Sequence, residues 1–198
     1  MTPSLPDFPA PSARDQAVLD ASRTVVQLFL RERSVDFSVK ELAGHTGLSE
    51  RTFYRYFPRK EDAIRPFVAA AIAHVVAAVR TAPADLPPAE AFRHALAGLL
   101  DMGRSVDVET FLTLVNGTDR LRAVWLQVLT DAEEAFAGVV AERLDLPGDS
   151  VHARFAGAVV VSASRLAIQP TSSASRPPSV VFAECMALVG PALLSRKE

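Results

Sequence analysis

The feature of this chain that most restricts its fold is a run of apolar residues between positions 60 and 80 that repeats every three or four residues. The run comprises Ile64, Phe67, Val68, Ala71, Ile72, Val75, Val76 and Val79. This spacing places the side chains on one face of an α-helix, whereas a half-buried strand requires alternation at every second residue. The same helical spacing recurs along the chain, and no segment alternates as a strand does. The sequence therefore predicts an all-α protein.

Capping residues, prolines and glycines set the limits of about nine predicted helices. They are expected at residues 13–33, 39–45, 50–56, 60–80, 89–103, 106–115, 119–144, 150–168 and 178–194. Pro66 lies in the first two turns of the fourth helix, where a proline is either tolerated or marks a small kink. The Pro-rich segment at residues 1–12 precedes the first helix and is expected to be a disordered arm.

Composition limits the compartment and the chemistry. The chain has 198 residues, 49% hydrophobic, and a net charge of -2, so it can bury a core but carries no overall basic charge for nucleic acid. One cysteine, Cys185, and four scattered histidines match no zinc pattern, so no metal and no cofactor are expected. The N-terminus lacks the features of a signal peptide, and the most apolar segment, residues 67–79, is shorter than the roughly 20 residues that span a bilayer. These features predict a soluble, cytoplasmic, nucleoid-associated protein with no membrane partner.

Residues 39–56 combine two short predicted helices with a tight turn. Leu42 and Phe53 are apolar where the helices would pack, and Gly47 permits a left-handed turn. Ser38 and Glu41 have the spacing of a capping box at the start of the first of these helices. This arrangement is typical of a helix-turn-helix.

The second short helix has an apolar face and a basic face. At about 100° per residue, Phe53 and Phe57 fall on one side, and Arg51 and Arg55 fall on the other. An outward arginine can bond guanine O6 and N7 together. Residues 40–60 contain five basic and two acidic residues, a local charge of +3 in a chain of net charge -2. The basic charge is therefore concentrated at the predicted helix-turn-helix.

The segment FSVKELAGHTGLSERTFYRYFPRKED, residues 37–62, resembles the N-terminal DNA-binding domain of TetR-family transcriptional regulators. The resemblance covers about residues 13–65 and extends to the remainder only in length and helical content. Members of that family are typically all-helical homodimers whose C-terminal domain binds a small molecule and thereby releases DNA. The resemblance implies a helix-turn-helix DNA-binding domain at 13–59 and a helical effector-binding and dimerisation domain at 60–198.

By motif position, the resemblance also implies a set of DNA contacts. Base or groove contacts are expected from Glu50, Arg51 and Arg55. Phosphate contacts are expected from Ser38, Thr52, Tyr54, Tyr56 and Lys60, and Ser49 is a predicted N-cap where a phosphate can also bind. The implied partner is double-stranded DNA with a palindromic operator. Two residues depart from the family pattern, because Ser34 replaces the glycine that usually closes the first helix, and Arg59 occupies a position that is usually small.

The middle helices carry candidates for an effector pocket, with ordinary core packing as the alternative for the aromatic residues and Met102. The candidates are Met102, Thr110, Phe111, Thr113, Trp125, Gln127, Phe136 and Arg165. Arg165 stands in an apolar run and requires a carboxylate, a ligand or an interface. The last two helices have small or apolar sides that can pack against a second copy or cover the chain's own core.

These observations predict a sequence-specific, DNA-binding transcriptional regulator and not an enzyme. The expected mechanism is that of a repressor, a homodimer bound to an inverted-repeat operator and released by a small-molecule effector whose identity the sequence does not disclose. Two alternatives stay open at this point. A helical interaction module would keep the fold without binding DNA, and a helical enzyme would need a catalytic constellation that the sequence does not supply.

Overall fold

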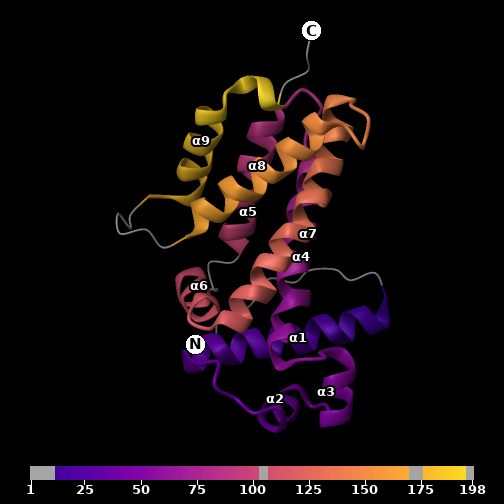
Figure 1. The fold of residues 1–198 in the computed structure, drawn as a ribbon, viewed down its shortest axis with the longest axis vertical. Coiled ribbons are helices and arrows are strands. Elements are labelled where there is room, and N and C mark those ends of the chain that lie inside the picture. Colours follow the sequence, from indigo (N-terminus) through magenta and orange to yellow (C-terminus); the bar gives the residue numbers. More distant parts are fainter. Residues whose placement is uncertain (1–11, 103–106, 170–175, 195–198) are drawn as a thin grey trace. The chain divides into compact units, whose positions relative to one another are not determined.

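A computed structural model describes residues 12–102, 107–169 and 176–194 (Figure 1). Helices make up all of the regular structure in these residues. The α-helices are α1 (Ala13–Glu32), α2 (Val39–Thr46), α3 (Glu50–Tyr56), α4 (Arg65–Thr81), α5 (Pro88–Met102), α6 (Val108–Asn116), α7 (Asp119–Leu144), α8 (Val151–Ile168) and α9 (Pro178–Val189). Two 3₁₀ helices, η1 (Lys60–Ile64) and η2 (Pro191–Leu194), precede α4 and follow α9. The predicted all-α class is confirmed.

Two predicted helices are interrupted. The helix expected over residues 60–80 begins as η1 and becomes α-helical only at Arg65, because Pro66 has no N–H to continue the α-helical hydrogen bonds. The helix expected to reach residue 194 ends at Val189, since Gly190 has φ of 88° and Pro191 follows it. The other helices begin and end within two residues of their predicted limits.

Helix α1 begins where the predicted N-terminal arm ends. Ser12, the last residue of the predicted arm, is the N-cap of α1, where its hydroxyl accepts a hydrogen bond from the Asp15 N–H at 3.1 Å. Residues 1–11, the remainder of the predicted arm, lie outside the described residues. At its other end α1 closes on Arg33, which adopts φ of 49°. The residue in the left-handed position is thus Arg33, one position before Ser34.

The chain divides into two compact units, and each unit is made from two stretches of sequence. The first unit spans residues 1–71 and 103–128, and the second spans residues 72–102 and 129–198. Both α4 and α7 therefore run from one unit into the other. The functional boundary expected between residues 59 and 60 stays a prediction, because compactness does not report which residues bind DNA or an effector.

The core of the first unit forms where α1 packs against η1, α2 and α6. Its fully buried side chains include Val25, Val26, Leu42, Phe53, Phe57, Ile64 and Leu112. A chain of aromatic contacts adds α6 and α7 to this core: the ring of Phe111 lies edge-on to Phe67 at 6.4 Å and to Trp125 at 6.0 Å between centroids. Burial of such rings stabilises the packing of elements that are distant in sequence.

The second unit has its own core, in which α9 packs against α8 and α5. Phe92 of α5 and Phe136 of α7 meet edge-on at 5.5 Å between ring centroids, and Phe182 of α9 is 1% exposed. Gly157 of α8 lies against the backbone of α7, since a Cβ atom at this position would be 2.5 Å from the Glu133 carbonyl oxygen. The two helices therefore meet backbone to backbone.

Two helical segments, Lys60–Thr81 and Val151–Ile168, are long and apolar enough to cross a membrane by length and composition alone. Core helices of soluble proteins pass the same test, so this is weak evidence for a membrane span. Within the first of these segments Phe67, Val75 and Val79 are buried inside the protein. Their burial accounts for an apolar face on a helix that packs against other helices.

Candidate nucleic-acid interface

Helix α2 begins at the predicted capping box. The Ser38 hydroxyl accepts a hydrogen bond from the Glu41 backbone N–H at 3.3 Å and donates one to the Glu41 carboxylate at 2.7 Å. The Ser38 backbone N–H donates to the same carboxylate at 2.8 Å. These two hydrogen bonds hold the pKa of Glu41 below its usual value of 4.5, and the bond from the Ser38 hydroxyl contributes more than the bond from the Ser38 N–H. The predicted capping box is confirmed, and it fixes the start of the helix-turn-helix.

The turn from α2 to α3 depends on Gly47, whose φ is 69°. Glycine adopts this left-handed conformation without the steric cost that a Cβ atom brings. The Leu48 N–H donates to the Ala43 carbonyl at 3.0 Å and so closes the end of α2. Ser49 then caps α3, because its hydroxyl accepts from the Thr52 N–H at 3.2 Å. Local chemistry therefore sets both ends of the turn.

Helix α3 has one buried face and one exposed face, as its sequence predicts. Phe53 is fully buried and packs edge-on against Phe57, with 5.0 Å between ring centroids. The exposed residues of α3 are Glu50, Arg51, Tyr54 and Arg55. Within the described part of the chain, Arg51 has no ion-pair partner. The helix thus presents two guanidinium groups, a carboxylate and a phenol on the side opposite its packing face.

Three further candidates are half-buried. The Thr52 hydroxyl oxygen accepts a hydrogen bond from the Ser49 hydroxyl at 3.0 Å. The ring of Tyr56 lies 5.6 Å from the Arg55 guanidinium carbon, within the range of a cation–π contact. Lys60 donates from Nζ to the Phe37 carbonyl oxygen at 2.9 Å. An ammonium group has three donors, so this bond leaves Lys60 able to bind a phosphate as well.

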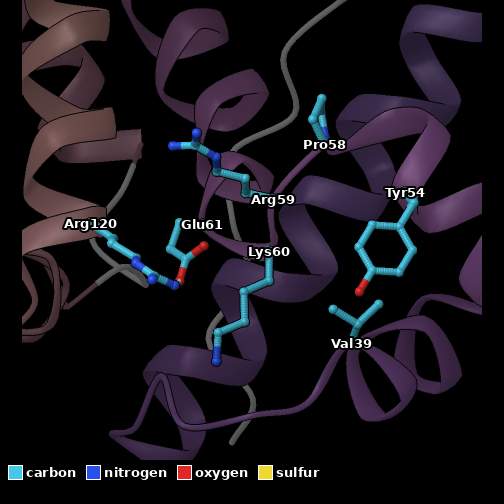
Figure 2. Close-up of a pocket in the computed structure, with 7 residues that line it drawn as sticks. All are labelled: Val39, Tyr54, Pro58, Arg59, Lys60, Glu61 and Arg120. Atoms are coloured by element: carbon cyan, nitrogen blue, oxygen red, sulfur yellow. Dashed lines mark ion pairs between the residues drawn. The ribbon is translucent and has the colours of Figure 1, made fainter.

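A cavity of about 510 Å³ lies beside α3 (Figure 2). It is lined by Val39, Tyr54, Pro58, Arg59, Lys60, Glu61 and Arg120. Glu61 is largely buried and lies 3.9 Å from the exposed guanidinium of Arg120. Three of the lining side chains are cationic and one is acidic, so the excess charge next to α3 is positive. Such a surface suits the sugar-phosphate backbone of DNA.

Residues 86–191, more than half of the chain, match the TetR C-terminal family model described as the MftR C-terminal domain. The chain belongs to the TetR family of transcriptional regulators. It is a DNA-binding transcription factor and not an enzyme, as the helix-turn-helix segment predicts. Membership of the TetR family implies operator DNA, a second copy of the chain and a small-molecule effector as classes of partner.

Individual TetR-family proteins resemble this chain to different extents. The HTH-type transcriptional regulator TcmR of Streptomyces glaucescens is 28% identical over 163 residues, which cover 77% of this chain and 70% of TcmR. FadR of Thermus thermophilus, a TetR-family repressor solved in complex with lauroyl-CoA, is 19% identical to this chain, with a TM-score of 0.61. The superposed region covers 93% of this chain and 97% of the FadR chain. A TetR-family regulator from Streptomyces coelicolor is 17% identical, with coverage of 89% and 84% and a TM-score of 0.51. The structural likenesses show a shared fold.

The candidate effector residues of this TetR-family chain are divided between the two compact units. Phe111 and Trp125 are buried and in contact in the first unit, whereas Phe136 packs on Phe92 in the second. Both pairs fit the core-packing alternative as well as a pocket wall. Arg165 is half-buried on α8, and the described residues include no ion-pair partner for it. The three alternatives for Arg165, a carboxylate, a ligand or an interface, therefore stay open.

The polar candidates have separate surroundings. Thr110 donates from its hydroxyl to the carboxylate of Asp107, the N-cap of α6, at 2.5 Å. Thr113 is exposed, and Gln127 is exposed at the edge of a cavity of about 370 Å³. The side chain of Met102 lies outside the described residues. An effector pocket built from these residues stays a prediction.

Two residues outside the predicted set, Arg120 and Ser22, also lie at these elements. Arg120 of α7 joins the lining of the cavity beside α3, although it lies 60 positions from Lys60, and its sequence context carries no signal for this placement. Ser22 of α1 is fully buried, and its hydroxyl bonds to the backbone of Ala63 in η1 and of Phe67 in α4. The sequence does contain a signal for Ser22, because a polar residue within the apolar stripe of the first helix indicates a buried hydrogen bond.

Proposed function

We propose that α3 enters the major groove of an inverted-repeat operator and reads base edges through Arg51 and Arg55, with Glu50 beside them. The observation that carries this proposal is the division of α3 into a buried Phe53 face and an exposed basic face. A buried face fixes the helix, and an exposed guanidinium can bond a guanine through two donors at once.

The phosphate backbone would be held by residues around α3. These are Ser38, Ser49, Thr52, Tyr54, Tyr56 and Lys60. Ser38 and Ser49 lie at helix N-termini, where backbone N–H groups favour an anion. Tyr54 and Lys60 line the same positively charged cavity, which offers a phosphate oxygen both a hydroxyl donor and an ammonium donor.

The functional unit would be a homodimer formed through α8 and α9. Their exposed large apolar residues include Val151, Phe155, Leu166, Val180, Leu188 and Val189. The small residues Ala156, Gly157 and Ala163 of α8 are buried within the chain itself, so the larger residues are the ones available to a second copy. Apolar side chains on two neighbouring helices support a self-complementary interface. A strictly monomeric mass by sedimentation at micromolar concentration would contradict it.

The regulator would act as a cytoplasmic repressor that a small-molecule effector releases from DNA. An effector that moves α4 changes the separation of the two recognition helices, which must match half-sites about 34 Å apart or a multiple of that distance. To empty the operator, the effector must prefer the released state by several kcal/mol. FadR, one of the structural neighbours, was solved with lauroyl-CoA, so acyl-CoA thioesters are a first class of effector to screen.

Selection of bound duplexes from a random library tests the DNA-binding proposal. The wild-type protein is expected to enrich a palindrome, with affinity that falls as salt rises. Arg51→Ala should cost about 1–3 kcal/mol and relax the preference at particular bases. Arg122→Ala is the matched control, since it removes the same charge from an exposed residue paired with Asp119 on α7.

The two outcomes separate the candidate functions. An enriched palindrome that Arg51→Ala reads less selectively, with Arg122→Ala unchanged, supports a sequence-specific regulator. The absence of enrichment and of salt-dependent binding would leave a helical interaction module as the better description.

A further inference from the structure

Ser22 is the one polar residue among the described residues that is fully buried. Its hydroxyl donates to the Ala63 carbonyl oxygen at 2.5 Å and accepts from the Phe67 backbone N–H at 3.1 Å. Ser22 lies on α1, whereas Ala63 lies near the end of η1 and Phe67 lies in the first turn of α4. One side chain therefore bonds to both sides of the junction between η1 and α4.

The two atoms that Ser22 bridges are the pair that a continuous α-helix would join. In such a helix the N–H of residue 67 donates to the carbonyl of residue 63. A side chain inserted at this point is one of the identifiable causes of a helix bend. Pro66 acts on the same turn, because it lacks the preceding N–H, which in a continuous α-helix would donate to the carbonyl of residue 62. The junction is thus built from a proline within the chain and a hydroxyl supplied by α1.

Neighbouring contacts place this junction between the DNA-binding residues and the candidate effector residues of the first unit. On the N-terminal side, Lys60 at the start of η1 donates to the Phe37 carbonyl just before the capping box of α2. On the other side, the ring of Phe67 contacts Phe111, which contacts Trp125. The residue whose N–H binds Ser22 is therefore also the residue that touches α6.

We infer that Ser22 is a positioning residue for operator binding: its hydroxyl sets the direction in which α4 leaves the helix-turn-helix, and so sets the half-site spacing that the dimer accepts. This inference rests on the proposed function, because spacing is defined only for a dimer on a two-part operator. Without the hydroxyl, the 63–67 bond can close directly, and α4 then continues η1 along a straighter path.

The test compares operators that differ only in spacing. The probes are the palindrome selected by the wild-type protein, the same palindrome with its half-sites one base pair closer or one farther apart, and a duplex with a single half-site. The wild-type protein should lose about tenfold or more in affinity when the spacing changes, similar to the cost of a mismatched base pair. Ser22→Ala should reduce or shift that preference while its affinity for the single half-site stays within about twofold of wild type.

Two further variants keep the test decisive. Thr24→Ala is the matched control, since it removes a hydroxyl that bonds only within α1, to the Asp20 carbonyl at 3.0 Å. Pro66→Ala restores the missing N–H without changing α1, so it should alter the spacing preference in the same direction as Ser22→Ala. If Ser22→Ala does not fold, Pro66→Ala alone tests whether the junction sets the half-site spacing.

The outcomes are distinguishable from failure of the proposed function. A changed spacing preference in Ser22→Ala or Pro66→Ala, with Thr24→Ala like wild type, supports the inference. An equal loss at every spacing and at the single half-site, or no change at all, overturns it while leaving the DNA-binding proposal intact. If the wild-type protein selects no palindrome, the proposed function and this inference both fail.

Discussion

The two compact units hold their helices together in different ways. Hydroxyl caps occur in both units, since Ser38 and Ser49 cap α2 and α3 in the first and Ser150 caps α8 in the second. The first unit adds the Ser22 hydroxyl, which bridges the start of α4. In the second unit, Gly157 brings two backbones together, and Arg143 of α7 donates to four carbonyl groups around the end of α4. A hydroxyl can rotate to a new partner, whereas a backbone contact or a four-bond guanidinium cannot rearrange without loss. The first unit therefore contains a bond at the start of α4 that can change partner, whereas the second contains contacts that cannot.

The largest effect is expected from Gly157→Ala, which tests the backbone contact between α7 and α8 in the second unit. The added Cβ would lie 2.5 Å from the Glu133 carbonyl oxygen and 2.7 Å from the Ala137 nitrogen, and neither backbone atom can move alone. We expect a loss of about 3 kcal/mol in the free energy of unfolding, measured by urea denaturation. Gly138→Ala on α7 is the control, because open space surrounds that position, and it should be neutral or stabilising by up to about 1 kcal/mol.

The next test removes the guanidinium that closes α4. Arg143 Nη1 donates to Val79 and Ala82, and Nη2 donates to Pro83 and Leu86, at 2.7–3.0 Å. Arg143→Ala should cost about 2 kcal/mol in the free energy of unfolding, because these carbonyls lose a charged donor. Arg143→Lys should recover only part of the loss, since one ammonium cannot serve four carbonyls. Full recovery by lysine would show that charge alone, without the fork geometry, stabilises this end of α4.

A smaller effect is expected from the cap of α2 in the first unit. Ser38→Ala removes the hydroxyl that accepts from the Glu41 N–H and should cost about 1 kcal/mol in the free energy of unfolding. Lys40→Ala, an exposed change in the same helix, is the control and should stay within about 0.5 kcal/mol of wild type. If Ser38→Ala destabilised the protein as much as Gly157→Ala, the contrast between the two units would not hold.

The smallest effect is a dependence on pH. The pKa of Glu41 is lower in the folded protein than its usual value of 4.5, so its capping contribution is present above pH 4.5 and is lost as the pH falls through the folded pKa. The stability difference between wild type and Glu41→Gln should therefore shrink as the pH is lowered below 4.5, as followed by urea denaturation at each pH. A difference that stays constant over this range would show that the carboxylate charge does not contribute to the cap.

Local signals account for the parts of the molecule that the sequence predicts well. The capping box, the Gly47 turn and the two faces of α3 each depend on residues within about four positions of one another, so their patterns are legible in the chain. Most of the contacts that set the arrangement of α4 join distant positions. Ser22 bonds to residues 41 and 45 positions away, and Arg143 bonds to carbonyls 57 to 64 positions away. Pro66 predicts a kink near the start of α4, but no local pattern indicates that Ser22 of α1 bonds to the backbone at that kink.

The aromatic contact between Phe111 and Trp125 also makes the first unit optically observable. Trp125 is the single tryptophan of the chain and is 8% exposed. Indole emission moves to longer wavelength when water reaches the ring, so the native fluorescence of the unlabelled protein reports the state of one defined place. Any compound or duplex that loosens α6 from α7 will shift the emission wavelength of Trp125, so binding can be titrated by intrinsic fluorescence without attaching a dye.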